Sequence, residues 1–131
     1  MKKAGILNKD ISEIIAGMGH MDMLVISDAG LPIPKGTRRI DLAIRAGLPK
    51  FLETVEAISY ELSVESIILA EETCQVSPHI WEALNSLFPD ARVEFVSHSK
   101  LKDISNTATA VIRTGEFTPY ANVILVSGVG F

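Results

Sequence analysis

The stretch Met18–Gly30, MGHMDMLVISDAG, contains three consecutive aliphatic residues, Leu24-Val25-Ile26, with an aspartate two positions away on each side. A short apolar run of this kind is typical of a strand that is covered on both faces. His20 comes shortly before the run and Asp28 shortly after it, so two side chains capable of acid–base chemistry bracket the predicted strand. The fold and the function of the chain are both expected to depend on this stretch.

Other segments of the chain continue the pattern in both directions. Three further apolar runs are predicted to be strands covered on both faces: Ser66–Ala70, Val93–Val96 and Val123–Val126. Apolar residues at spacings of three and four predict helices within four segments: Leu7–Met18, Phe51–Leu62, Ile80–Leu87 and Leu101–Val111. Strands that alternate with helices indicate an α/β class, a layered fold with a mainly parallel sheet flanked by helices. With 131 residues, we expect a single domain over residues 1–131.

In open α/β sheets, ligands bind at the carboxyl ends of the strands. The residues expected at those ends are Asp28, Glu71 with Glu72, His98 and Ser127. The loop that carries His20 precedes its strand, so we expect it at the opposite end of that strand. The predicted topology therefore separates His20 from the other polar residues.

Composition excludes several classes of function. The formal charge is −4 and no long basic run occurs, which argues against nucleic-acid binding. No apolar run approaches the roughly 20 residues of a membrane span, and no apolar segment follows Lys2-Lys3 as in a secretory signal. The single cysteine, Cys74, cannot form an internal disulfide, so we expect a cytoplasmic protein.

Metal and nucleotide motifs are missing from the sequence. His20, His79 and His98 are scattered and show no metal-ligand spacing. Glu71 and Glu72, taken as neighbours on a strand, are expected to point to opposite faces. There is no GxxxxGK[ST] motif for phosphates. We therefore expect neither a metal nor a cofactor.

Each polar candidate has two interpretations. His20, in a glycine-flanked loop, is either a surface residue or a proton-transfer group, because histidine titrates near neutral pH. Asp28 either caps the turn that follows it or accepts hydrogen bonds from a polyol. His98 either binds a ligand or merely neighbours a helix cap at Ser99. Tyr120, in the loop before the last strand, either packs under that loop or stacks on a sugar.

Two blocks of sequence point to a family. They comprise Gly19–Pro34 continued by Arg39-Ile40-Asp41, and Ala110–Glu116 leading to Pro119–Asn122. These blocks resemble the D-ribose pyranases, the sister group of the fucose mutarotases. Within the first block, Gly30–Pro34 is similar to the ribose branch. The resemblance covers the whole chain and is weakest through residues 73–92.

The resemblance implies an isomerase that interconverts the pyranose and furanose forms of D-ribose without a cofactor. It implies that His20 is the catalytic acid. The sugar contacts that it implies are Asp28, His98, Tyr120, Ala121 and Asn122. It also implies a homo-oligomer, a decamer of two stacked pentameric rings, with active sites between neighbouring subunits. The carboxyl ends of the strands of a partner subunit would then lie next to His20.

Opening a cyclic hemiacetal removes a proton from the anomeric hydroxyl and delivers one to the ring oxygen. Our hypothesis is that His20 protonates the ring oxygen while Asp28 and His98 orient the hydroxyls. His98 and an ordered water both remain candidates for the proton acceptor. Two other functions stay open: a non-catalytic sugar-binding accessory protein of ribose uptake, and a metal-dependent sugar isomerase or aldolase-like enzyme.

Overall fold

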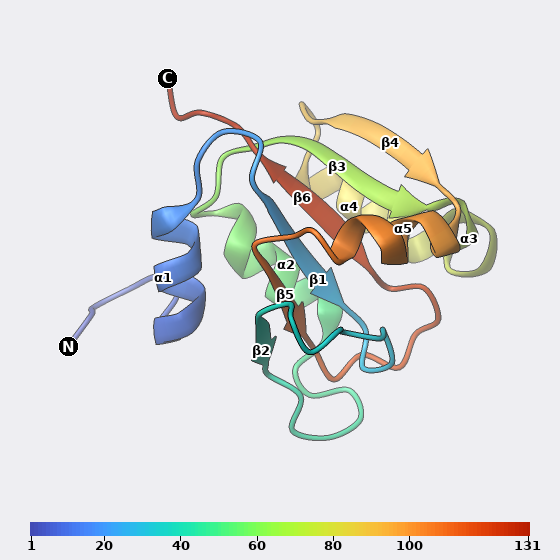
Figure 1. Ribbon diagram of the computed structural model, residues 1–131, viewed down its shortest axis with the longest axis horizontal. Helices are drawn as coiled ribbons and strands as arrows, with labels where there is room; N and C mark the ends of the chain where they lie inside the picture. Colours follow the sequence, from blue (N-terminus) through green and yellow to red (C-terminus); the bar gives the residue numbers. More distant parts are fainter.

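The computed structural model describes residues 1–131 as one six-stranded sheet with helices on both faces (Figure 1). The strands are β1 (Met23–Ser27), β2 (Arg39–Asp41), β3 (Val64–Ala70), β4 (Arg92–Val96), β5 (Ala110–Arg113) and β6 (Val123–Ser127). The helices are α1 (Lys9–Gly17), α2 (Phe51–Ser59), α3 (Glu71–Val76), α4 (Pro78–Leu87) and α5 (His98–Ser105). None of these helices has the length and apolar character needed to cross a membrane.

The sheet has the strand order β2-β5-β1-β6-β3-β4. Strand β6 pairs antiparallel with β1 on one side and with β3 on the other, while the other three pairs are parallel. The expected mainly parallel sheet is therefore confirmed, with one reversed strand inside it. Because β6 is reversed, Ser127 lies at the end of the sheet opposite Asp28, and its predicted place at the carboxyl ends of the parallel strands is wrong.

Alternate residues of β1 face different helical layers. Leu24 and Ile26 belong to a large apolar cluster with α1, α2 and α4, whereas Val25 belongs to a smaller cluster with α5. Figure 1 shows α5 in front of the sheet and α2 and α4 behind it. All three β1 residues are fully buried. Burying such a side chain contributes about 1.5–3 kcal/mol, so this run secures the contact between the layers.

The first helix follows from local sequence chemistry. The side chain of Asn8 accepts a hydrogen bond from the backbone N–H of Ile11 at 3.0 Å, which satisfies one free donor of the first turn. Ile11 and Ile14 are buried against the core. The helix ends at Gly17, as the glycines after the apolar stripe indicate. The helix predicted within 7–18 is thus confirmed.

Several elements differ from the expectation. The helical pattern predicted over 101–111 stops at Ser105, and Ala110–Arg113 forms β5. Strand β5 lies between β2 and β1, so pairing on both of its edges outweighs a spacing that also fits a helix. Strand β4 is an edge strand with largely exposed side chains, so it is not covered on both faces.

The two adjacent glutamates also lie in an unexpected element. Glu71 and Glu72 are the first residues of α3, a helix that the sequence analysis missed. They are therefore not strand neighbours, and the argument that they point to opposite faces of a sheet is wrong. Acidic residues favour the first turn of a helix because the free N–H groups there carry partial positive charge.

Gly115 brings two loops into close contact. Its N–H donates to the carbonyl of Pro49 at 2.9 Å, and its carbonyl accepts from the N–H of Gly47 at 2.7 Å. A Cβ atom on Gly115 would lie 2.5 Å from the carbonyl oxygens of both Arg45 and Leu48. These are backbone atoms and cannot swing aside as the end of a side chain would. Only glycine fits at this position.

We expect Gly115→Ala to destabilise the protein by about 1–3 kcal/mol, the usual range for overpacking. Thermal unfolding followed by circular dichroism measures the loss. The matched control is Gly36→Ala, because no atom lies within 4 Å of a Cβ placed there. Equal thermal midpoints for the two variants would contradict the close approach at Gly115.

Candidate functional site

The carboxylate of Asp28 is held at the end of β1 by three hydrogen bonds around the residue. Its backbone N–H donates to Oδ1 of Asn122 at 2.9 Å, and Nδ2 of Asn122 donates to Oδ2 of Asp28 at 3.0 Å. Oδ1 of Asp28 accepts from the N–H of Gly30 at 2.9 Å, as in a capped turn. Asn122 is almost fully buried. Each carboxylate oxygen keeps a further lone pair for a ligand.

The polar residues before β6 reach the same end of the sheet as Asp28 because β6 runs in the reverse direction. Tyr120 has a φ of +60°, in the left-handed region that non-glycine residues rarely occupy. Its carbonyl accepts a hydrogen bond from the hydroxyl of Thr73 at 2.8 Å. The neighbouring carbonyl of Pro119 accepts from the hydroxyl of Ser77 at 2.7 Å.

Thr73 and Ser77 are both buried, and they belong to the α3–α4 junction. The two hydroxyls fix the backbone of the loop that carries Tyr120. Neither residue was predicted from the sequence, because both fall within 73–92, where the family resemblance is weakest. The available signal was two hydroxyl residues four positions apart, a spacing that is common on any helix.

His98 is the first residue of α5. Its backbone N–H donates to both carboxylate oxygens of Glu72, at 3.2 and 3.0 Å. The helix cap is Ser97, whose side chain accepts from the N–H of Lys100 at 3.1 Å, so the expected cap at Ser99 is wrong by two positions.

The ring of His98 lies edge-to-face against Tyr120, with centroids 5.0 Å apart and the planes at 78°. Nδ1 of His98 is buried and has no hydrogen-bond partner. Buried polar atoms are nearly always paired in folded proteins, so an unpaired one at a ligand rim is available to a bound molecule.

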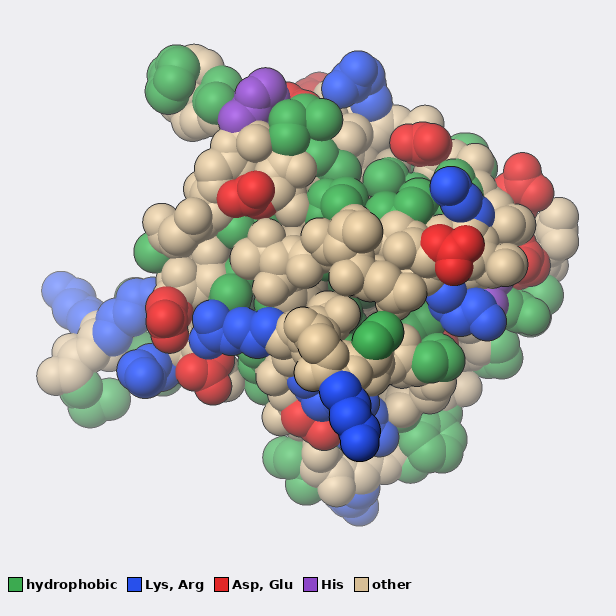
Figure 2. Space-filling view, viewed as in Figure 1, with side chains coloured by type: hydrophobic (Ala, Val, Ile, Leu, Met, Phe, Trp, Pro, Cys, Tyr) green, Lys and Arg blue, Asp and Glu red, His purple; other side chains and the backbone are tan.

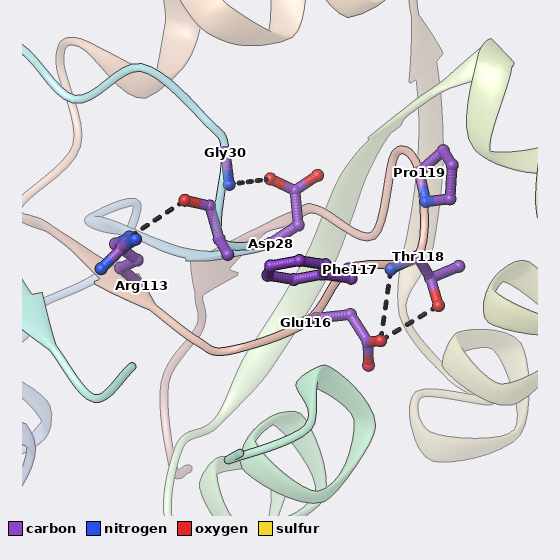
Figure 3. Close-up of a pocket in the computed structure, with 8 residues that line it drawn as sticks. Asp28, Gly30, Arg113, Glu116, Phe117, Thr118 and Pro119 are labelled. Carbon is purple, nitrogen blue, oxygen red and sulfur yellow. Dashed lines mark hydrogen bonds between the residues drawn. The ribbon is translucent and has the colours of Figure 1, made fainter. Parts of the chain in front are cut away.

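A cavity of about 390 Å³ opens beside Asp28. Figure 3 shows Asp28, Arg113, Glu116 and Phe117 among the residues that line it. Nε of Arg113 donates to the carbonyl of Ala29 at 3.0 Å, and its Nη1 pairs with the carboxylate of Asp41 at 3.1 and 3.2 Å. Volumes of this order suit small ligands.

Glu116 links this cavity to α2. Its carboxylate accepts hydrogen bonds from the N–H of Phe51 at 3.1 Å and from the hydroxyl and N–H of Thr118 at 3.0 and 3.3 Å. Partial burial acts to raise the pKa of Glu116, but these hydrogen bonds together outweigh it and hold the pKa below its ordinary value of 4.5. The charged carboxylate of Glu116 therefore connects the first residue of α2 to the loop that contains Thr118.

His20 lies at the other end of the sheet. Its side chain is 54% exposed, and its Nε2 lies 2.9 Å from Oε2 of Glu65. Met21, the next residue, has a φ of +72° and donates its N–H to the carbonyl of Ser127 at 2.8 Å. The five residues of β1, about 16 Å long, separate this loop from Asp28.

The structure thus brings together most of the predicted site residues and leaves one apart. Four of them surround the carboxyl ends of the parallel strands and are called the rim below: Asp28, Asn122, Tyr120 and His98. His20 does not reach the rim within one chain. Ala121, another predicted sugar contact, is fully buried in the core. No three His, Cys, Asp or Glu side chains are grouped as a metal site.

The fold and the site define a class: an α/β domain with a hydrogen-bonding ligand rim at the carboxyl ends of its parallel strands. The chain belongs to the RbsD / FucU transport protein family, whose pattern matches residues 1–130. A D-ribose pyranase of Chloroflexus aggregans is 57% identical over the full length of both chains, and one of Symbiobacterium thermophilum is 56% identical.

Solved structures agree with this assignment. Bacillus subtilis RbsD complexed with D-ribose is 46% identical, covers all of both chains and superposes with a TM-score of 0.96. The fucose mutarotase of Streptococcus pneumoniae, in complex with L-fucose, is 23% identical, with a TM-score of 0.81 over 95% of each chain. The second likeness concerns the fold alone.

Glu116 gives the protein a pH-dependent contribution to stability. Its pKa is lower in the folded chain than in the unfolded one, so its contribution is fully present above pH 4.5 and is lost as the pH falls through the folded value. We expect Glu116→Gln to lower the thermal midpoint at pH 7. The gap between wild type and variant should narrow below pH 4.5.

Thermal unfolding at a series of pH values from neutral to acidic measures this gap. The control is Glu82→Gln, which removes an exposed carboxylate of α4 that makes no side-chain hydrogen bond. It should leave the midpoint nearly unchanged throughout. A gap for Glu116→Gln that stays constant or widens in acid would contradict the assigned direction.

Proposed function

We propose that the chain is a D-ribose pyranase, an isomerase that interconverts the pyranose and furanose forms of D-ribose, acting as one domain over residues 1–131. The geometric observation that supports this most is the unpaired Nδ1 of His98, buried beside Tyr120 at the rim that holds the Asp28 carboxylate. The full-length likeness to D-ribose pyranases and to the ribose complex of RbsD supports the substrate.

The proposed reaction breaks and re-forms one C–O bond of the hemiacetal, assisted by two proton transfers. An imidazolium at His20 gives its proton to the ring oxygen as the bond from the anomeric carbon to that oxygen breaks. The anomeric hydroxyl loses its proton, and the open chain has a free aldehyde. Closure through a different hydroxyl reverses both transfers. A positioned acid and base contribute about 10²–10⁴-fold, which is enough because water already performs the reaction slowly.

The rim residues have separate roles in this proposal. The Asp28 carboxylate accepts hydrogen bonds from sugar hydroxyls, and Asn122 holds that carboxylate in place. Tyr120 and Ala121 contact the sugar, and His98 orients a hydroxyl through Nδ1. Two acceptors remain for the anomeric proton: Nδ1 of His98 and an ordered water. No cofactor takes part.

We further propose that neighbouring subunits complete each site. His20 and the rim lie at opposite ends of β1, so they can meet only if one end of a chain contacts the other end of its neighbour. Contacts of this head-to-tail type form a ring when the rotation between neighbouring subunits closes. A pentameric ring, stacked on a second one as a decamer, is the assembly that we propose.

Exposed apolar side chains support such contacts. Ile44 and Phe117, near the cavity, are 76% and 72% exposed, and Met21 beside His20 is 58% exposed. Figure 2 shows hydrophobic side chains reaching the surface between charged ones on this face of the molecule. We place the protein in the cytoplasm. There Cys74 remains a thiol, and burial raises its pKa.

The first test measures catalysis. We expect wild type to accelerate exchange between the cyclic forms of D-ribose, and His20→Ala to lose about 10²–10⁴-fold of that acceleration. Saturation-transfer NMR on the sugar reports the exchange rates. His79→Ala is the matched control, because His79 is an exposed histidine on α4.

Two results would contradict this proposal. If ribose bound but its exchange stayed at the buffer rate, the chain would be a sugar-binding accessory protein. If a chelator abolished activity and a ketose appeared, the chain would be a metal-dependent isomerase.

The second test concerns shared sites. His20→Ala and Asp28→Asn are each expected to be nearly inactive alone. After subunit exchange in an equal mixture, about one quarter of the sites of a symmetric ring would combine an intact rim with an intact His20. The exchange rate should then recover to about a quarter of the wild-type value. No recovery in mixed oligomers would mean that each chain carries its own complete site.

A further inference from the structure

The imidazole of His20 has one hydrogen-bond partner in its own chain, and that partner comes from a distant strand. Nε2 of His20 lies 2.9 Å from Oε2 of Glu65, which is in β3. The Glu65 side chain is 28% exposed and the His20 side chain 54% exposed, so the carboxylate is the more deeply set of the two. Glu65 is not among the site residues predicted from the sequence.

The backbone around Glu65 is irregular in a way that directs its side chain. The pairing of β3 with β6 changes register between Val64 and Ser66, so Glu65 is the extra residue of a β-bulge. Bulges turn a side chain away from the regular alternation and are frequent beside active sites. A Cβ atom on Gly128 would lie 3.1 Å from the Cβ of Glu65, so glycine at this position leaves room for the glutamate.

The loop of His20 is fixed to the same end of β6. The N–H of Met21 donates to the carbonyl of Ser127 at 2.8 Å, with Met21 in the left-handed region. The N–H of Gly19 donates to Oδ2 of Asp22 at 2.8 Å. The residues on both sides of His20 are therefore held by hydrogen bonds. Ser127, the last residue of β6, accepts the hydrogen bond from the loop and also pairs with β3 next to the bulge.

We propose that Glu65 is a positioning residue for His20. Its Oε2 accepts a hydrogen bond from Nε2–H, which sets the orientation of the ring and its neutral tautomer. Nδ1 is then the nitrogen that gives a proton to the sugar and takes one back, while Glu65 keeps its charge. Arg92 lies 3.8 Å from Oε1, the other oxygen of Glu65, so Oε2 remains for the imidazole.

This inference rests on the proposed function for the role of His20 in ribose exchange, but the tautomer of His20 can be measured without activity. A histidine whose one nitrogen is held by a carboxylate keeps the proton on that nitrogen. The chain has only three histidines, so His→Ala variants assign each ring in nitrogen-15 NMR spectra.

The kinetic arm compares Glu65→Ala and Glu65→Gln with wild type by saturation transfer on D-ribose. We expect Glu65→Ala to lower kcat about tenfold or more and to change KM little. The loss is part of the rate factor that a positioned acid–base group contributes. Glu65→Gln should keep part of kcat, because its amide oxygen still accepts from Nε2–H. Glu94→Gln on β4 is the matched control and should match wild type.

The spectroscopic arm records the His20 ring where it is neutral. Wild type should carry the proton on Nε2, and Glu65→Ala should show a mixture of both tautomers. An unchanged tautomer in Glu65→Ala, or a kcat equal to wild type in both Glu65 variants, overturns the inference. If Glu65→Ala does not fold, the kcat of Glu65→Gln decides. If wild type does not accelerate exchange, the proposed function fails and the tautomer alone decides whether Glu65 holds His20.

Discussion

The reversed strand β6 is the constraint on which the rest of the structure depends. It joins two parallel groups of strands, β2-β5-β1 and β3-β4, and all five of its residues are buried. Its two ends lie at the two places where the proposed site residues are found. The residues before it, Tyr120–Asn122, reach the rim beside Asp28, and the residues after it meet the His20 loop and Glu65. Hydrogen bonds along both edges of β6 hold these two places at a set distance.

The rim is a candidate ligand site whose side chains and loop backbone are held by hydrogen bonds. Asn122 is buried and gives its amide to Asp28, and the hydroxyls of Thr73 and Ser77 hold the backbone of the loop with Tyr120. The left-handed conformation at Tyr120 is costly and persists because its surroundings fix it. An unpaired buried nitrogen on His98 adds to that cost. Strain and an unpaired polar atom at one rim are typical of a site shaped for a ligand.

The separation of His20 from the rim has a physical consequence for the proposed mechanism. A catalytic group must lie within hydrogen-bond reach of the proton that it transfers, and the length of β1 prevents this within one chain. In the proposed enzyme, assembly would therefore be part of catalysis. The apolar surfaces near each end would bring two subunits together, and Glu65 would orient the imidazole at the resulting contact.

The sequence alone determined the strands at Leu24–Ile26 and Val123–Val126, the α/β class and the family, because short buried runs and long matching blocks are local signals. It also identified His20, Asp28 and His98 as polar residues next to predicted strands. Only the tertiary structure decided that β6 is reversed, that 110–113 is a strand, and that Glu65 contacts His20. These three features depend on which strand edges pair in the folded chain. Residue spacing along the sequence does not determine that pairing.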